Sequence, residues 1–436
     1  MSSNPRKQLE VRVWNKAVGV LEQTGTLQHV FTYLADAPNT HFVSLTMPVR
    51  AESYVWEIGL HPFFQVNLPE GYRKDALRQR FGPVATVDDF SLLALTGAST
   101  LGRVTVHNVS DKGTNRTPHG SVADILSRPD SRSALLEYLE ETPLDAVAGV
   151  MPKALAADER LTLKTPEWLV KTGRDDTPGV CVNEYLCLEL ARRIGLPVPN
   201  TDLAEDGDVL AVARFDLSED KQPLGLEDMC SLLGLAPHQK YDATAEQLAR
   251  AMLAFVSSSE KLDSSRRLLD MLVLNAVVRN ADGHAKNFAL LYTDLDHVAL
   301  APVYDLLTVH AYSSYAKNPY ALLIGGTKGW NLRRPLERFA VERLSLKASH
   351  VRETVENIAS QMTGMAHQFK EMAERFPQFR EPAKAMVRAW SDGIATFNEG
   401  SKPVSVDLSA ANFSEEKRSP KKRVSRKIMN PGTIPQ

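Results

Sequence analysis

The feature that most constrains the fold is a change of pattern near Glu227. Before it, short runs of β-type residues alternate with turns, as in 161–164 and 168–171 on either side of the turn 165–167. After it, apolar residues recur at helical spacing over long stretches. The main helical runs are 244–257, 266–279, 351–376 and 382–397. A β-rich part followed by a larger helical part predicts an α+β fold of two lobes, an architecture that can hold a nucleotide between its lobes.

Two further shifts in composition divide the chain. Residues 110–120 are polar and rich in turn-forming residues, which predicts a boundary there. Residues 401–436 carry eight Lys and Arg against three Asp and Glu, a net charge of +5 in a chain whose total is −2. Four units are therefore predicted. They are an N-terminal subdomain (1–115), a β-rich lobe (116–225), a helical lobe (226–400) and a basic flexible tail (401–436).

Bulk composition and cysteine usage indicate the compartment. Hydrophobic residues make up 43% and charged residues 24% of the chain, which is typical of soluble globular proteins. The cysteines are Cys181, Cys187 and Cys230, an odd number without a Cys-x-x-Cys pair, which favours a reducing compartment. The first residues lack the apolar core of a signal peptide, and no apolar run approaches the roughly 20 residues that cross a bilayer. These features predict a cytoplasmic protein with no membrane partner.

The segment 279–288, Arg-Asn-Ala-Asp-Gly-His-Ala-Lys-Asn-Phe, carries the clearest chemistry. Asp282 and Asn287 have the Asp-x-x-x-x-Asn spacing of a kinase catalytic loop, where the carboxylate takes the proton of the acceptor hydroxyl and the amide oxygen helps to hold Mg²⁺. Asp305 follows Asn287 by 18 residues, with a predicted strand and turn between them that would return it to the loop. Asp282 is thus the candidate base, and Asn287 and Asp305 are the candidate metal ligands. The alternative is a polar loop with an Asp that caps a turn.

A kinase also needs a strand lysine for the nucleotide phosphates, and the chain offers Lys164 and Lys171. Lys171 ends the more apolar strand and lies nearer the next helix, in which Glu184 could pair with it. We therefore favour Lys171, while Lys164, or a plain surface role for either lysine, stays open. Upstream, residues 147–153 contain one glycine, Gly149, and on composition alone predict a phosphate loop only weakly.

Other catalytic classes fit the sequence less well. His284, His297 and His310 lie within 27 residues but lack the spacing of a zinc site, and no cysteine accompanies them. No Gly-x-Ser-x-Gly motif indicates a serine hydrolase. The histidines are therefore expected to have ordinary roles, with His284 in the catalytic loop.

Taken together, these motifs resemble the HipA family, the kinase toxins of bacterial HipBA toxin–antitoxin modules. The resemblance runs from about residue 11 to residue 397. Its segments are Leu-Pro-Glu-Gly (68–71), Asn-Glu-Tyr (183–185), Arg-Phe-Asp (214–216), Glu-Asp-Met-Cys (227–230), Asp-Gly-His-Ala-Lys-Asn-Phe (282–288) and Pro-Val-Tyr-Asp (302–305). It implies a protein-kinase-like fold of two lobes with an extra N-terminal subdomain. It also implies ATP and Mg²⁺ as cofactors, with Asp282 as the general base and Asn287 and Asp305 as Mg²⁺ ligands.

The resemblance also assigns the nucleotide-binding residues. Lys171 matches the ATP-phosphate lysine, and Ala213 and Phe215 match the hinge that meets adenine, where the family commonly has a glutamate in place of the alanine. The matches to the phosphate loop and the nucleotide lining are Ala148, Gly149, Val150, Met151, Pro152, Lys153, His284, Lys286 and Tyr304. Ala146 stands where the family has the serine of inhibitory autophosphorylation, and Met151 replaces the usual glutamine. These departures imply an active kinase with altered self-control, and a weakened nucleotide site is the alternative that stays open.

The resemblance implies a serine/threonine protein kinase that is the toxin of a type II toxin–antitoxin system. Its substrate would be a protein, which in the best-known case is an aminoacyl-tRNA synthetase. Its partners would be a HipB-like DNA-binding antitoxin and, mainly through it, operator DNA, with a possible contact from the basic segment 415–427. Two alternatives stay open. One is a small-molecule kinase of the aminoglycoside- or choline-kinase type, and the other is a non-catalytic member of an antitoxin–DNA repressor complex.

Overall fold

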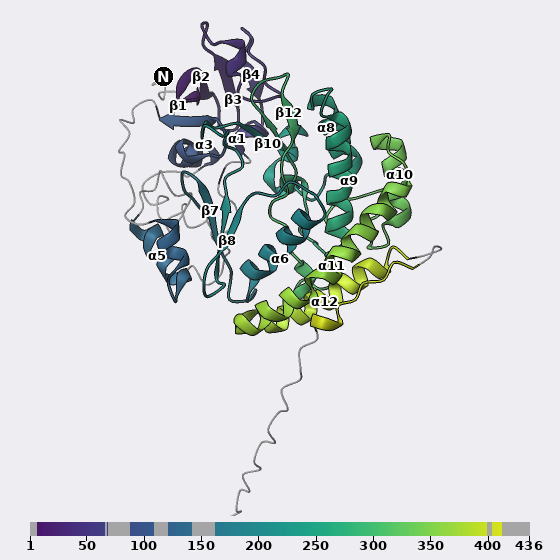
Figure 1. Cartoon of the computed structure of the whole chain (residues 1–436). Coiled ribbons are helices and arrows are strands. Elements are labelled where there is room, and N and C mark those ends of the chain that lie inside the picture. Colours follow the sequence, from purple (N-terminus) through teal and green to yellow (C-terminus); the bar gives the residue numbers. More distant parts are fainter. Residues whose placement is uncertain are drawn as a thin grey trace, which may run out of the picture.

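The computed structural model describes residues 7–65, 68, 88–108, 121–141, 162–398 and 403–411. Within these ranges the chain forms three antiparallel β-sheets and a large helical layer (Figure 1). The sheets follow one another along the sequence, and the long helices come last, as the change of pattern near Glu227 predicts. The predicted boundary at 110–120 lies outside the described residues. The strand that precedes it ends at Asn108.

The N-terminal sheet is built from short strands with alternating burial. Its strands are β1 (Lys7–Val13), β2 (Lys16–Gln23), β3 (His29–Tyr33), β4 (Tyr54–Trp56) and β5 (Val104–Asn108), in the order β4-β3-β2-β1-β5. Trp14 and Asn15 join β1 to β2 with φ of 50° and 61°, the left-handed values that a two-residue hairpin turn requires. One face of the sheet packs on α1 (Pro62–Gln65) and α3 (Asp89–Thr96) to form a separate core.

The second sheet is covered by helices on both faces. It consists of β6 (Thr162–Lys164), β7 (Trp168–Thr172), β9 (Val209–Ala213) and β8 (Thr201–Leu203), in that spatial order. Val170 and Ala211 pack with α4 (Val122–Leu126) and α5 (Ser131–Glu141), whereas Leu210 and Val212 pack with the start of α6 (Val180–Arg193). Because successive side chains of a strand point to opposite faces, Lys171 beside Val170 points toward α6. The predicted hairpin 161–171 and the helix that follows it are thus confirmed.

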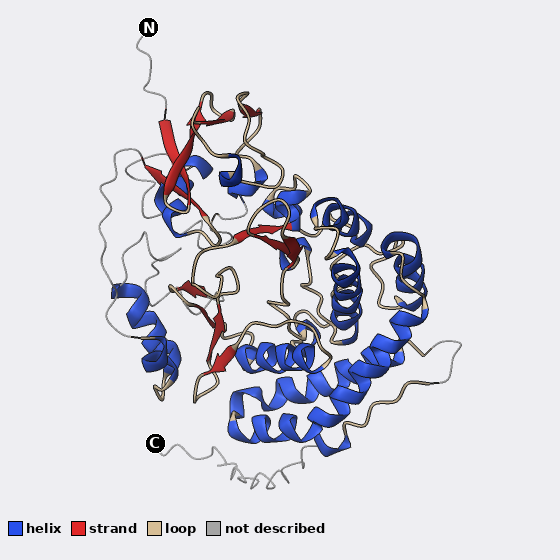
Figure 2. Ribbon diagram, turned by 45° about the horizontal axis from the view of Figure 1, so that its top comes forward, coloured by secondary structure: helices blue, strands red, loops and turns tan. Residues whose placement is uncertain are grey.

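The helical lobe contains the third sheet and the largest core. Its strands are β10 (Gly225–Asp228), β11 (Ala289–Tyr292) and β12 (Val298–Leu300). Its helices are α7 (Met229–Leu232), α8 (Ala245–Phe255), α9 (Lys261–Val277), α10 (Arg333–Leu344), α11 (Ser349–Arg375) and α12 (Arg380–Ala395). Figure 2 shows the helices as a curved layer on one side of the strands. At Gly393 a Cβ atom would lie 1.9 Å from the carbonyl oxygen of Val277, so only glycine lets α12 pass the end of α9.

The start of the predicted flexible tail is packed rather than free. Leu408 and Ala411 are buried in the core of the helical lobe, and the Val404 N–H donates to Asn398 Oδ1 at 2.7 Å. Periodicity could not reveal this segment, because residues 403–408 form no helix or strand and are followed only by a short 3-10 helix, Ser409–Ala411. Its basic part, 415–427, lies outside the described residues.

Two buried charged side chains join the N-terminal subdomain to the helical lobe. The Arg103 guanidinium is enclosed by the rings of Trp14, Phe42 and Tyr292, with ring centroids 4.3–4.9 Å away, and donates to the Thr293 carbonyl at 2.7 Å. Such contacts replace part of the hydration that the cation loses on burial.

Glu227 provides the second connection between these parts. Its carboxylate accepts hydrogen bonds from Ser44 Oγ at 2.7 Å and from the Leu45 N–H at 2.9 Å, both in the N-terminal subdomain. Ser231 Oγ donates at 2.6 Å from its own lobe. Burial raises the pKa of Glu227 to about 7, even though these hydrogen bonds act in the opposite direction.

In the part of the chain that the structure describes, no helix combines the length and apolar character that crossing a bilayer would require.

The raised pKa of Glu227 predicts a pH-dependent stability. The folded form holds the Glu227 proton more tightly than the unfolded form, so this contribution is complete below about pH 4.5 and is lost as the pH rises through about 7. We expect Glu227→Gln, which stays neutral, to remove up to about 3 kcal/mol of this pH dependence. Urea unfolding of both proteins between pH 4.5 and 8 measures the difference. Parallel curves for the two proteins would contradict the assignment.

Candidate active site

The loop after α9 is held by asparagine side chains. Arg279 reverses the chain with φ of 57°. Asn280 then donates to Asn275 Oδ1 at 2.7 Å and accepts the Asp282 N–H at 3.1 Å. A Cβ atom at Gly283 would lie 2.7 Å from Asn275 Oδ1, so a larger residue would displace this side chain. The backbone that carries Asp282 is therefore fixed from the buried end of α9.

The Asp282 carboxylate is partly exposed, at 44% of its side chain, and is oriented by a residue of a distant loop. The Tyr241 hydroxyl donates a short hydrogen bond to Asp282 Oδ1. His284 Nε2 lies 3.9 Å from the same oxygen, and its ring packs edge-on against Tyr241. Burial lowers the pKa of His284, which favours a neutral imidazole at pH 7. One carboxylate oxygen is thus held by a phenol, while the side chain keeps access to solvent.

A chain of polar contacts connects the second sheet to the catalytic loop. Lys171 Nζ donates to Glu184 Oε1 of α6 at 2.8 Å and to Asp305 Oδ1 at 3.1 Å. Asn287 Nδ2 donates to Asp305 Oδ2 at 3.0 Å. Glu184 is fully buried and the Lys171 side chain is 10% exposed, whereas the Asp305 side chain is 33% exposed. These contacts therefore bring together four parts of the chain, which are β7, α6, the segment before β11 and the segment after β12.

Asp305 adopts a left-handed backbone conformation, with φ of 56°. Only a few non-glycine residues accept this conformation, Asp and Asn among them. The flanking chain is anchored on both sides, because the Val303 N–H donates to the Pro197 carbonyl at 2.8 Å and the Thr308 N–H donates to Asn183 Oδ1 at 2.8 Å. A strained position that its surroundings hold firmly is characteristic of functional sites.

A cavity of about 260 Å³ adjoins this cluster. Tyr304 stacks on Phe215 with ring centroids 5.1 Å apart, and its hydroxyl donates to the Lys286 carbonyl at 2.7 Å. Phe63 and Leu101 of the N-terminal subdomain also reach the lining. The lining from the other parts of the chain is Leu169, Lys171, Val212, Phe215, Leu226, Glu227, Asp228, Lys286, Ala289 and Tyr304. The cavity is mainly apolar and has the Lys171 ammonium in its wall.

The two candidate lysines have different surroundings. Lys164 Nζ donates to the Thr100 carbonyl of the N-terminal subdomain, and burial lowers the pKa of Lys164 to about 8. Lys171, by contrast, meets Glu184 and Asp305. Geometry therefore brings Lys171, and not Lys164, to the catalytic loop.

The structure places the other predicted site residues as follows. Phe215, Lys286 and Tyr304 line the cavity, and His284 lies at Asp282. Ala213 ends β9, and its N–H donates to the Asn200 carbonyl at 2.8 Å. Ala146 and the predicted phosphate loop Ala148, Gly149, Val150, Met151, Pro152 and Lys153 lie outside the described residues.

Among the residues in the ranges given above, no group of three or more His, Cys, Asp or Glu side chains gathers in a way that could hold an ion. His284, His297 and His310 accordingly form no metal site with one another.

Sequence reasoning missed Tyr241 and the pair Asn275 and Asn280. Tyr241 lies 41 residues before Asp282, in the turn between α7 and α8, and no spacing rule relates the two positions. The asparagines lie within and directly after a helical run, where only their polarity on a buried stretch marks them.

Comparison with known proteins gives matches to two family models and to named relatives. The model of the HipA N-terminal domain matches residues 9–107, and that of the HipA-like C-terminal domain matches residues 146–368. The relative Y4dM of Sinorhizobium fredii, named as a candidate kinase, is 28% identical over 336 residues, or 70% of this chain and 78% of its own. The serine/threonine-protein kinase toxin HipA of Shewanella oneidensis is 24% identical over 358 residues, or 72% of this chain and 78% of its own.

A solved structure shows the same fold. The matching chain comes from the complex of Shewanella oneidensis MR-1 HipA, HipB and operator DNA. It superposes with a TM-score of 0.66 at 18% identity, over 89% of this chain and 96% of the other. The C-terminal family match alone covers more than half of the sequence. With its α+β, kinase-like fold and both domain matches, this chain belongs to the HipA family, whose members include kinases.

Proposed function

We propose that this chain is an ATP- and Mg²⁺-dependent serine/threonine protein kinase and the toxin of a type II toxin–antitoxin system. One observation carries the proposal, the contact of Lys171 with both Glu184 and Asp305 beside an apolar cavity. A lysine of the β-rich lobe paired with a helix glutamate is the arrangement that protein kinases use to hold nucleotide phosphates.

The nucleotide-binding residues follow from the cavity. Its apolar walls and the stacked pair of Phe215 and Tyr304 suit a planar base, and Lys171 would face the phosphates. We propose Ala213 as the adjoining hinge and residues 148–153 as the phosphate loop. The proposed domain organisation is that predicted from the sequence, except that residues 403–411 belong to the helical lobe. His284 and Lys286 complete the proposed lining.

Asn287 and Asp305 would hold Mg²⁺. An amide oxygen and a carboxylate are the hard donors that Mg²⁺ prefers, and kinase sites use one or two such side chains together with phosphates and water. Two protein ligands suffice for this arrangement. The bound ion would neutralise charge on the transferring phosphoryl group.

Asp282 would act as the general base. As the oxygen of the acceptor hydroxyl bonds to the γ-phosphorus, the proton of that hydroxyl moves to the Asp282 carboxylate. The bond from the γ-phosphorus to the bridging oxygen breaks, and its electron pair leaves with ADP. Tyr241 holds Oδ1 through its hydroxyl, which would orient the carboxylate for the transfer.

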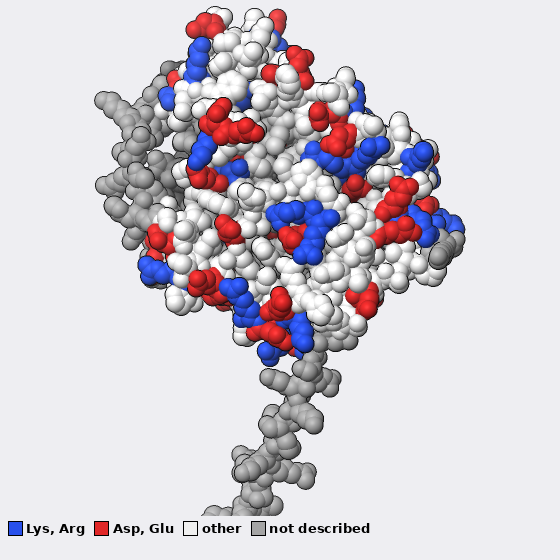
Figure 3. Space-filling view, in the orientation of Figure 1, with Lys and Arg blue, Asp and Glu red and all other residues white. Residues whose placement is uncertain are grey.

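We propose that the partners are a HipB-like antitoxin and, mainly through it, operator DNA. The structurally similar HipA chain was solved with HipB and operator DNA, which supports both. On the face shown in Figure 3, Lys and Arg side chains are interspersed with Asp and Glu, so this face gives no continuous basic surface. The basic segment 415–427 is the part of the chain that we propose for direct DNA contact. The substrate would be a protein, such as an aminoacyl-tRNA synthetase.

The deciding experiment is transfer of labelled γ-phosphate from ATP in the presence of Mg²⁺ and host lysate. We expect one or more labelled proteins, and a loss of labelling of at least about 100-fold with Asp282→Asn and with Asp305→Asn, since each removes a charged group of the transfer step. Asp296→Asn, in the exposed β11–β12 turn, is the matched control and should label normally. Full labelling by the Asp282 variant would refute its role. ATP binding without any labelled protein would favour a small-molecule kinase, and no ATP binding would favour a non-catalytic member of a repressor complex.

The two lysines provide a matched pair for the nucleotide site. We expect Lys171→Met to weaken ATP binding roughly tenfold or more, because it removes the ammonium at the phosphates and leaves Glu184 buried without its lysine. Lys164→Met should leave the ATP dissociation constant within about threefold. Isothermal titration with ATP and Mg²⁺ measures both. The reverse ranking would make Lys164 the phosphate lysine.

Salt-dependent DNA binding tests the tail. We expect the chain alone to bind duplex DNA with an affinity that falls as salt rises, and the slope of log affinity against log salt to become shallower after deletion of residues 414–427. Each phosphate contact contributes about 0.9 to that slope. Identical slopes with and without the segment would rule out its contact with DNA, and no salt-dependent binding by either form would leave DNA binding to the antitoxin.

A further inference from the structure

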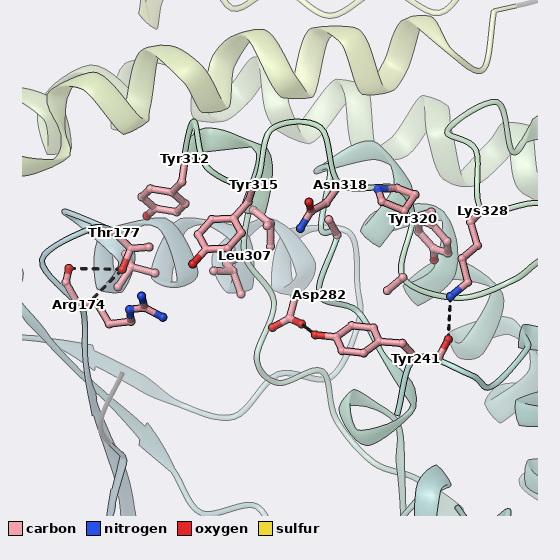
Figure 4. A pocket seen from close by; sticks show the side chains of 15 residues that line it. Arg174, Thr177, Tyr241, Asp282, Leu307, Tyr312, Tyr315, Asn318, Tyr320 and Lys328 are labelled. Carbon is pink, nitrogen blue, oxygen red and sulfur yellow. Dashed lines mark hydrogen bonds between the residues drawn. The ribbon is translucent and has the colours of Figure 1, made fainter. Parts of the chain in front are cut away.

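A second and larger cavity, of about 540 Å³, opens beside Asp282. Among the residues that the structure describes, it shares no lining residue with the cavity at Lys171, and the catalytic loop contributes Asp282 to the one and Lys286 to the other. Figure 4 shows the Asp282 carboxylate between the Tyr241 hydroxyl on one side and the side of the cavity that holds Tyr315 and Leu307 on the other. The proposed base therefore lies in the wall of this second cavity.

The walls of this cavity are apolar and aromatic. Four of the lining residues are buried apolar or aromatic side chains, namely Leu307, Val309, Tyr312 and Tyr320. Its volume is in the range of cavities that enclose whole small ligands, and it far exceeds what a single hydroxyl-bearing side chain needs. A substrate that presents its hydroxyl to Asp282 therefore brings further groups into the cavity, and the walls favour large apolar ones.

The charge around the cavity is unequal. Among the described lining residues Asp282 is the one acid, whereas Arg174 and Lys328 are basic. Lys328 Nζ donates to the Tyr241 carbonyl at 2.8 Å, which leaves its positive charge uncompensated by this contact. Arg174 pairs with Asp176 at the surface, where such pairs are weak, and its Nε is buried without a hydrogen-bond partner. Both cations are thus positioned to attract an anionic group of a ligand.

From these observations we infer the acceptor class. This cavity binds a protein segment in which the phosphorylated Ser or Thr has a large apolar residue beside it and a carboxylate side chain that reaches Lys328, while Arg174 lies at the opposite end of the cavity, where it can meet a second carboxylate (Figure 4). The inference rests on the proposed kinase function, since it gives a substrate to the base Asp282. The aromatic walls select the apolar neighbour, Lys328 selects the acidic one, and Tyr241 keeps Asp282 facing the entering hydroxyl.

A positional-scanning library of serine peptides, with labelled ATP and Mg²⁺, tests this directly. We expect enrichment of Phe, Tyr, Leu or Met at one position next to the serine, and of Asp or Glu over Lys or Arg by about tenfold at another. Selection of basic residues, or no selection at all, would overturn the inference. The inference would also be overturned if proteins of the lysate were labelled and no peptide of the library was. If neither is labelled, the kinase function itself fails.

Charge reversal at the cavity distinguishes recognition from general damage. Lys328→Glu should lower the ratio of acidic to basic peptide phosphorylation by about tenfold or more, whatever happens to the overall rate. The matched control is Lys317→Glu, an exposed lysine close in sequence that does not line the cavity, and its ratio should equal that of the wild type. ATP binding is measured in parallel for each variant. An unchanged ratio in Lys328→Glu, or the same change in both variants, would refute the role of this cavity.

Discussion

The buried ammonium of Lys171 is the contact on which the candidate site depends. A cation with only 10% exposure is unfavourable unless it is paired, and Glu184 and Asp305 provide that pairing from two different parts of the chain. The pairing fixes the distance between β7 and α6 and, through Asn287, the position of the catalytic loop. Lys171 and Glu184 belong to the same lobe, so the ion pair of Lys171 with Asp305 is the one that joins the two lobes, and this pair would be lost if one lobe moved away.

The N-terminal subdomain contacts both the helical lobe and the second sheet, and it contributes to the wall of the cavity beside Lys171. Arg103 and Glu227 attach it to the helical lobe through buried polar contacts, and Lys164 attaches it to the second sheet. Phe63 and Leu101 extend it into the wall of the cavity beside Lys171. A change at the surface of this subdomain therefore has a short physical route to the candidate nucleotide site.

The sequence predicts the local parts of this structure well. Spacing identified the loop of Asp282 and Asn287, the strand pattern identified the hairpin that returns Asp305 to it, and the apolar character of its strand favoured Lys171. These features depend on residues near each other in the chain, which periodicity and turn chemistry encode. The contact of Tyr241 with Asp282 and the aromatic enclosure of Arg103 join positions that are far apart, and they emerge only from the packing of the whole fold. The packed segment 403–411 was missed for the same reason.

The left-handed conformation of Asp305 has a consequence for the evolution of such a chain. Glycine at this position would relieve backbone strain of about 1 kcal/mol, but it would also remove the carboxylate that meets Lys171 and Asn287. The residue that the backbone favours and the residue that the chemistry needs are therefore different. Without this carboxylate Glu184 would still pair with Lys171, so a lineage released from selection for activity could drift to glycine here, and the identity of residue 305 indicates whether a homologous gene is still under selection as an enzyme.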